Sequence, residues 1–162
     1  MDMEIIDLGE TIVIGVRAAP DSGRCLEEAL AAFRLRRKEI GGTDGMARLV
    51  INRVPGEGSG LPCECVAGLE APSLENIPEG MAGWLVPPGR YARFGAGDLS
   101  EIAGACRAVL AEWLPGSGYR MAESPLLIQS DSGIPDSPAA AWRINLPLVN
   151  PGELADLRKW ID

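Results

Sequence analysis

The sequence predicts an α+β fold that contains two copies of a strand-helix-strand-strand unit. Strand-like and helix-like patterns occur in the same order at about residues 4–70 and again at about 80–148. Each helical pattern carries one apolar stripe, and a helix of that kind must cover a sheet. Two such units side by side predict a two-layer protein of sheet and helices. A groove is expected between the pseudo-symmetric halves, and interfaces of this kind are common ligand sites.

The first copy begins with a β-branched, apolar run at residues 11–17, which is typical of a buried strand. Residues 24–40 have apolar positions at helical spacing and are followed by a pair of glycines that ends a helix. Two further strand patterns, at residues 47–54 and 61–70, are separated by a loop rich in glycine. They predict a hairpin that completes the unit.

The second copy repeats this order. A strand is expected at residues 84–94, with a bend or bulge at the Pro-Pro-Gly sequence of residues 87–89. The strongest helical stripe of the chain follows at residues 98–113, and residues 115–118 are expected to stop it. Two more strands are predicted at residues 119–130 and 141–148.

The chain length of 162 residues suits one domain, which we assign to residues 1–162. A chain of this size buries roughly 70% of its extended surface, which is enough for a stable core without disulfide bonds or bound metals. The stretch 71–79 is rich in proline and lacks periodicity, so it is expected to connect the two copies. The tail at 151–162 has the apolar spacing of a short terminal helix.

Composition excludes several classes of function. The formal net charge of −8 argues against a nucleic-acid partner, because affinity for DNA depends on lysine and arginine. No apolar stretch is long enough for a membrane span, and the acidic N-terminus lacks the features of a secretory signal. We therefore expect a cytoplasmic protein without a membrane partner.

No metal or cofactor is expected. The chain has no histidine and no Cys-x-x-Cys pair. We interpret its cysteines as buried, reduced thiols, since few cysteines in a chain of this size do not indicate a disulfide framework. They are Cys25, Cys63, Cys65 and Cys106.

Several motifs in fixed order carry a family resemblance. They are VPPGRYARF at residues 86–94, AEWLPGSGY at 111–119, ESPLLIQSD at 123–131 and WRINLPL at 142–148. Together with the first-half strands they cover nearly the whole chain. In this order and spacing they resemble the GyrI-like domain, also called the bacterial effector-binding domain.

The resemblance implies a central cleft that binds lipophilic, often cationic aromatic compounds, as multidrug-binding family members do. It suggests a stand-alone ligand-binding protein that is not an enzyme. Two alternatives stay open. One is a hydrolase of strained, cyclopropanoid toxins, for which Glu64 is the one candidate acid or base. The other is a protein-interaction module, such as a gyrase modulator or a partner of a regulator.

The family's motif also suggests site residues, and here the sequence departs from it. The central-strand glutamate of the family falls on Ile128, and its acidic and tyrosine positions on the last strand fall on Arg143 and Asn145. Alternation along that strand directs Trp142, Ile144 and Leu146 toward the helices and the two polar residues toward the groove. An arginine there would repel a cationic ligand. An alternative is that both polar residues simply face solvent.

Other positions complete the expected lining of the groove. Glu64 is a candidate for the missing carboxylate, for a salt bridge to Arg143, or for a solvated side chain. Trp84 and Tyr91 are candidate aromatic walls for a planar ligand, although most aromatic side chains pack in the core. The full predicted ligand-binding set is Asn52, Glu64, Cys65, Trp84, Tyr91, Ile128, Arg143 and Asn145.

Overall fold

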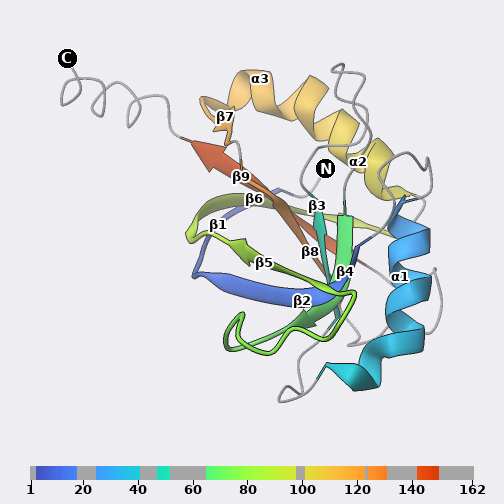
Figure 1. Cartoon of the computed structure of the whole chain (residues 1–162). Helices are drawn as coiled ribbons and strands as arrows, with labels where there is room; N and C mark the ends of the chain where they lie inside the picture. The colour runs from blue at the N-terminus through green and yellow to red at the C-terminus, as the bar shows by residue number, and fades with distance from the viewer. Residues whose placement is uncertain are drawn as a thin grey trace.

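The computed structural model shows a strongly curved antiparallel sheet with helices on one of its faces (Figure 1). Glu64, Asn52 and the predicted tail helix at 151–162 lie outside the residues that the structure describes. Those residues are 3–17, 25–40, 47–51, 65–97, 101–122, 124–130 and 142–149.

One sheet contains the nine strands found in these residues. Its order is β1-β6-β9-β8-β3-β4-β2-β5, and the short β7 pairs with β9. All pairings are antiparallel. The strands are β1 (Glu4–Leu8), β2 (Thr11–Arg17), β3 (Ala47–Ile51), β4 (Cys65–Glu70), β5 (Ala82–Val86), β6 (Gly89–Ala96), β7 (Arg120–Met121), β8 (Leu126–Ser130) and β9 (Trp142–Val149).

The strand order confirms the duplicated α+β fold. In the first copy β4 lies between β2 and β3, and in the second copy β9 lies between β6 and β8. The two copies join where β3 pairs with β8. Each copy also receives a strand from the other, because β1 pairs with β6 and β5 pairs with β2. The predicted hairpin of β3 and β4 is confirmed as an antiparallel pair.

The prediction of one strand at residues 84–94 was wrong. The structure has two strands there, separated by Pro87 and Pro88, and they belong to different ends of the sheet. A proline has no N–H to give to a strand ladder, so two in succession end the pairing rather than bend it. The chain crosses from one copy to the other at this point.

The sheet curls until its two ends lie close together. Two residues link β1 to β2, and two link β5 to β6, although the linked strands stand at opposite ends of the strand order. A link of this length spans at most about 10 Å. The ends must therefore be neighbours, and the sheet has an inner face, turned away from the helices, that is partly enclosed.

Two glycines permit a close approach inside this curved sheet. Gly15 of β2 pairs directly with Gly68 of β4. A Cβ atom on Gly15 would overlap the carbonyl oxygen of Ala67, and one on Gly68 would overlap that of Ile14. Only glycine fits where two strands approach so closely. The pair also leaves part of the inner face without side chains.

The helices cover the outer face. They are α1 (Cys25–Arg36), which continues into the 3₁₀ turn η1 (Arg37–Glu39), then α2 (Ile102–Ala108), the π-helical segment η3 (Val109–Trp113) and α3 (Leu114–Ser117). Between helices and sheet lies a core that we call the helix-side core. Its largest members include Phe33, Ile102, Leu126, Ile128, Trp142, Ile144 and Leu146. No helix among the described residues is long and apolar enough to cross a membrane.

The second helix ends later than the sequence suggested. It continues past Pro115 to Ser117, and Gly118 then takes a left-handed conformation with φ of 82°. Pro115 lies at the start of α3, which directly follows the π-helical segment η3, and the helix passes through it instead of stopping there. Gly118 ends the helix, as the sequence around it indicated.

Candidate functional site

A polar cluster lies on the inner face, close to the junction of the two copies. Arg93 of β6 is directly opposite Asn145 of β9, which is in turn opposite Leu127 of β8. Side chains alternate along a strand, so Gln129 shares the face of Leu127. Three strands thus bring Arg93, Gln129 and Asn145 together from distant parts of the sequence.

Hydrogen bonds fix this polar cluster. The guanidinium of Arg93 donates from Nε to Asn145 Oδ1 at 2.9 Å and from Nη2 to Gln129 Oε1 at 3.0 Å. Asn145 is fully buried and donates from Nδ2 to the Leu127 carbonyl oxygen at 2.9 Å and to Gln129 Oε1 at 3.2 Å. The arrangement holds the half-buried Arg93 side chain in one orientation.

Both partners of Arg93 are neutral. Within the described part of the chain, no carboxylate lies at ion-pair distance from its guanidinium; Glu4, opposite it in register on β1, forms no ion pair with it. The amides satisfy two donors of the guanidinium without cancelling its charge. Arg93 therefore presents a positive charge, held by neutral groups, on the inner face.

Two more arginines lie on the same face beside Gln129. Arg48 of β3 and Arg143 of β9 are each directly opposite Gln129 in register. Arg48 is 9% exposed, and its Nη2 lies 3.5 Å from Glu70 Oε2. Burial lowers the pKa of Arg48, and the nearby Glu70 partly offsets this. Arg143 is exposed. We call the region formed by Arg48, Arg93, Gln129, Arg143 and Asn145 the arginine end.

Another part of the inner face is apolar. Residues from both ends of the sheet meet there, as expected for a curled sheet, and we call them the inner cluster. Tyr91 is 1% exposed, its hydroxyl donates to the Pro87 carbonyl oxygen at 2.7 Å, and burial raises its pKa. The members are Val13, Val50, Val86, Tyr91 and Leu127, with Ile6, Leu8 and Trp84 packed against them.

Trp84 lies at the margin of the inner cluster. Its side chain is half-buried, and its Nε1 atom is buried without a hydrogen-bond acceptor among the described residues. An indole N–H usually finds a partner when it is buried, because an unmade bond costs free energy. The Trp84 N–H is therefore a buried donor without an acceptor among the described residues.

The structure places the predicted site residues on two different faces. Arg143 and Asn145 lie on the inner face, while Trp142, Ile144 and Leu146 lie in the helix-side core, which confirms the predicted alternation of β9. Trp84 and Tyr91 also lie on the inner face, with Tyr91 fully packed. Asn52 and Glu64 lie outside the described residues.

Ile128 and Cys65 require a correction. Both belong to the helix-side core and are at most 1% exposed, so neither side chain reaches the inner face. The motif indicated the right strand for Ile128 but not the face, and a shift of one residue reverses the face. On β8 the inner face carries Leu127 and Gln129. The family resemblance implied a carboxylate at position 128. The inward-facing residues on either side of that position are Leu127, which is apolar, and Gln129, which carries a neutral amide.

Sequence reasoning missed Arg48, Arg93 and Gln129. A signal for Arg93 was present, since it stands two residues from Tyr91 on one strand and must share its face. The contact of Arg93 with Gln129 joins residues 36 positions apart, and no local pattern gives that pairing.

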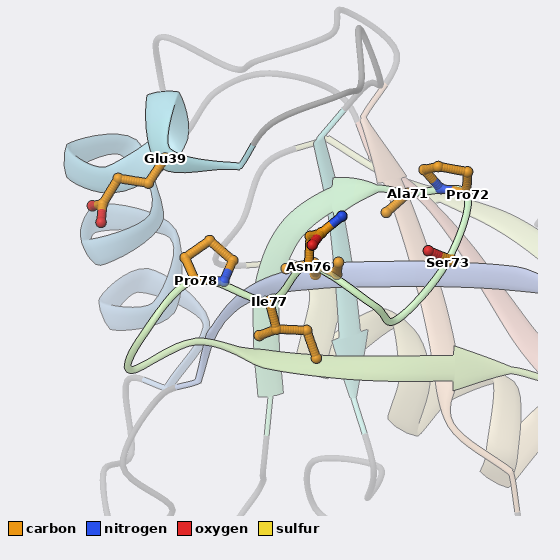
Figure 2. A pocket seen from close by; sticks show the side chains of 8 residues that line it. Glu39, Ala71, Pro72, Ser73, Asn76, Ile77 and Pro78 are labelled. Carbon is orange, nitrogen blue, oxygen red and sulfur yellow. The ribbon is translucent and has the colours of Figure 1, made fainter.

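A separate pocket lies on the helix side of the sheet, with a volume of about 760 Å³. The connection between the two copies folds over it, as Figure 2 shows. Arg36 helps to hold this connection, because it donates to both carboxylate oxygens of Glu39, at 2.7 and 2.9 Å, and to the Glu79 carbonyl oxygen at 2.7 Å. The lining residues are Ile14, Glu39, Ala71, Pro72, Ser73, Asn76, Ile77 and Pro78.

Comparison with known proteins places the fold. No protein-family model matches the sequence, and no curated protein matches it. Among solved structures, SAV2435 bound to tetraphenylphosphonium is 14% identical, with a TM-score of 0.60 over 94% of this chain and 97% of that one. The C-terminal domain of EcmrR is 14% identical, with a TM-score of 0.65 over 92% and 98%.

A third similar structure is described as a hydrolase encoded by lin2189 from Listeria innocua. It is 12% identical, with a TM-score of 0.53 over 91% of both chains. At identities this low, the structural likeness shows the fold alone. The ligand and the chemistry have to be inferred from the residues of this chain. The chain shares the GyrI-like fold of these structures, as its motifs suggested.

Proposed function

We propose that this protein binds a small lipophilic or aromatic molecule on the inner face of its curled sheet. The observation that carries the proposal is the arrangement of that face, where fixed polar groups adjoin an apolar cluster. Sites for small molecules combine these two features, with a few polar groups that orient the ligand. The similar structure with bound tetraphenylphosphonium supports small-molecule binding on this fold.

Access to the proposed site is through the arginine end. The inner cluster is closely packed, with each of its five buried members at most 1% exposed. By contrast, Arg93 and Gln129 are half-buried and Arg143 is exposed. A ligand would therefore place its polar group at the arginine end and its apolar part toward Trp84, at the margin of the inner cluster.

The competing location is the pocket beside residues 71–78. It has room for a ligand, but its lining offers one charged group, Glu39, which Arg36 already engages. We favour the inner face because its charged and neutral donors are oriented by hydrogen bonds and face the apolar cluster.

A steric block at each location separates the two. We expect Gln129→Trp to weaken binding of an aromatic ligand such as 2-naphthoate at least tenfold, and the matched variant Asn76→Trp, in the helix-side pocket, to leave affinity within about twofold. Isothermal titration calorimetry measures both, and circular dichroism checks that both variants are folded. Loss of binding in Asn76→Trp alone would assign the ligand to the other pocket and refute the proposal.

A binding role is favoured over the hydrolase alternative. A hydrolase needs an acid or base beside the ligand. In the described part of the inner face, Glu70 is half-exposed and contacts Arg48, while Glu4 is exposed on the edge strand β1. Glu4 lies opposite Arg93 in register but forms no ion pair with it, and Glu70 contacts Arg48 instead. The net charge of −8 also favours a small ligand over nucleic acid as the partner.

A further inference from the structure

The charge at the arginine end differs from that of a cation-binding site. A site for a lipophilic cation needs a carboxylate to make the buried charge tolerable. Here the inner face presents the cationic side chains of Arg48, Arg93 and Arg143 around Gln129. The Arg48 guanidinium lies 3.5 Å from the carboxylate of Glu70, and Glu4 lies opposite Arg93 in register without forming an ion pair with it.

Arg93 has only neutral hydrogen-bond partners among the described residues. Its Nε and Nη2 atoms are held by amide oxygens, and its Nη1 atom makes no hydrogen bond to the described residues. Two neutral acceptors fix the plane of the guanidinium and leave its full charge and further N–H donors for another molecule. Arginine in this state binds carboxylates well, since its planar fork matches their geometry.

We propose that the ligand is an organic anion, an aromatic or lipophilic carboxylic acid whose carboxylate is bound by Arg93. Arg143 and Arg48 add a positive field at the same end of the face, and the apolar part of the acid lies toward Trp84. This inference rests on the proposed function, because it names the chemical class of the ligand for that same site.

The test uses three aromatic probes of matched shape: 2-naphthoate, 2-naphthamide and 2-naphthylmethylammonium, which are anionic, neutral and cationic. Calorimetric titration of the intact protein gives the affinity for each. We expect 2-naphthoate to bind at least about tenfold more tightly than 2-naphthamide, the size of effect that one charge-assisted hydrogen bond contributes. The ammonium compound should bind most weakly.

Variants on one strand test the role of Arg93. We expect Arg93→Gln to reduce the preference for naphthoate over naphthamide to about twofold or less, and circular dichroism checks that the variant is folded. The matched control is Arg90→Gln on the same strand, where the exposed arginine contacts Asp7 at 3.4 Å. That variant should keep the full preference.

The outcomes separate the two proposals. If none of the three probes binds, the proposed function fails and the inference fails with it. If the neutral or cationic probe binds as tightly as naphthoate, small-molecule binding stands and the inference is wrong. A preference for naphthoate that survives in Arg93→Gln would also overturn it, because the selecting group would then lie elsewhere.

Discussion

The two regions of the inner face are made from the same strands but serve different purposes. In the inner cluster, side chains from opposite ends of the sheet pack until almost no surface remains exposed. At the arginine end, Arg93 and Gln129 stay half-buried and Arg143 stays exposed, around the fully buried Asn145. The contrast suggests that one region closes the curled sheet, while the other is kept available for a ligand.

The largest effect is expected in the inner cluster. Leu127 is 1% exposed, so Leu127→Ala should lower the free energy of unfolding by about 2–5 kcal/mol, through lost burial and the cavity that remains. Leu85 on β5 is 43% exposed, and Leu85→Ala should change that free energy by about 0.5 kcal/mol or less. Urea denaturation measures both. Equal losses of unfolding free energy in Leu127→Ala and Leu85→Ala would contradict the stabilising role of the inner cluster.

A smaller effect, on binding rather than stability, is expected at the arginine end. Gln129 Oε1 accepts hydrogen bonds from Arg93 and Asn145, so the carboxylate of Gln129→Glu would accept the same bonds and neutralise Arg93. We expect the affinity for 2-naphthoate to fall about tenfold, with the free energy of unfolding changed by about 1 kcal/mol or less.

The control for this change is Gln129→Met, which removes the acceptor without adding charge. It should keep the preference for naphthoate over naphthamide. If Gln129→Glu also keeps that preference, the charge of Arg93 does not select the ligand.

The smallest effect lies outside the inner face, at η1. Hydrogen bonds from Arg36 lower the pKa of Glu39 below its ordinary 4.5. A lowered pKa in the folded state stabilises the protein above the pKa of the unfolded state, and this stabilisation is lost as the pH falls through the lower value. Glu39→Gln should therefore slightly lower the melting temperature at neutral pH, and the difference from wild type should disappear in acid.

The exposed Glu28 of α1 provides the matched control for that measurement. Glu28→Gln should show no comparable pH-dependent difference in melting temperature, and neither variant should alter the preference for naphthoate. A change in ligand preference on loss of Glu39 would mean that the helix-side pocket takes part in binding.

Local patterns were sufficient for the two main helices and for one face of β9, but they missed β1 and the break between β5 and β6. The apolar stripe of the second helix placed Ile102 and Cys106 in the helix-side core, where burial raises the pKa of the Cys106 thiol to about 12. Alternation along β9 correctly assigned Ile144 to the helix-side core and Asn145 to the inner face. These predictions succeed because the periodicity of a helix or strand is a property of neighbouring residues.

The site itself depends on information that a local pattern does not contain. The motif on β8 led to Ile128, whereas the inward residues are Leu127 and Gln129, because a family position without a strand register does not fix the face. The meeting of Arg93 with Gln129 and Asn145 depends on the order β6-β9-β8. The sequence suggested the two prolines only as a bend, whereas the chain crosses there from β5, which pairs with β2, to β6, which pairs with β9.

The most direct test of this account is a crystal structure of the complex with 2-naphthoate. The account predicts that the carboxylate lies within hydrogen-bond distance of the Arg93 guanidinium, with the naphthalene ring directed toward Trp84 on the inner face. A naphthoate bound instead among residues 71–78, or on the inner face with its ring against Arg93 and its carboxylate in solvent, would contradict it.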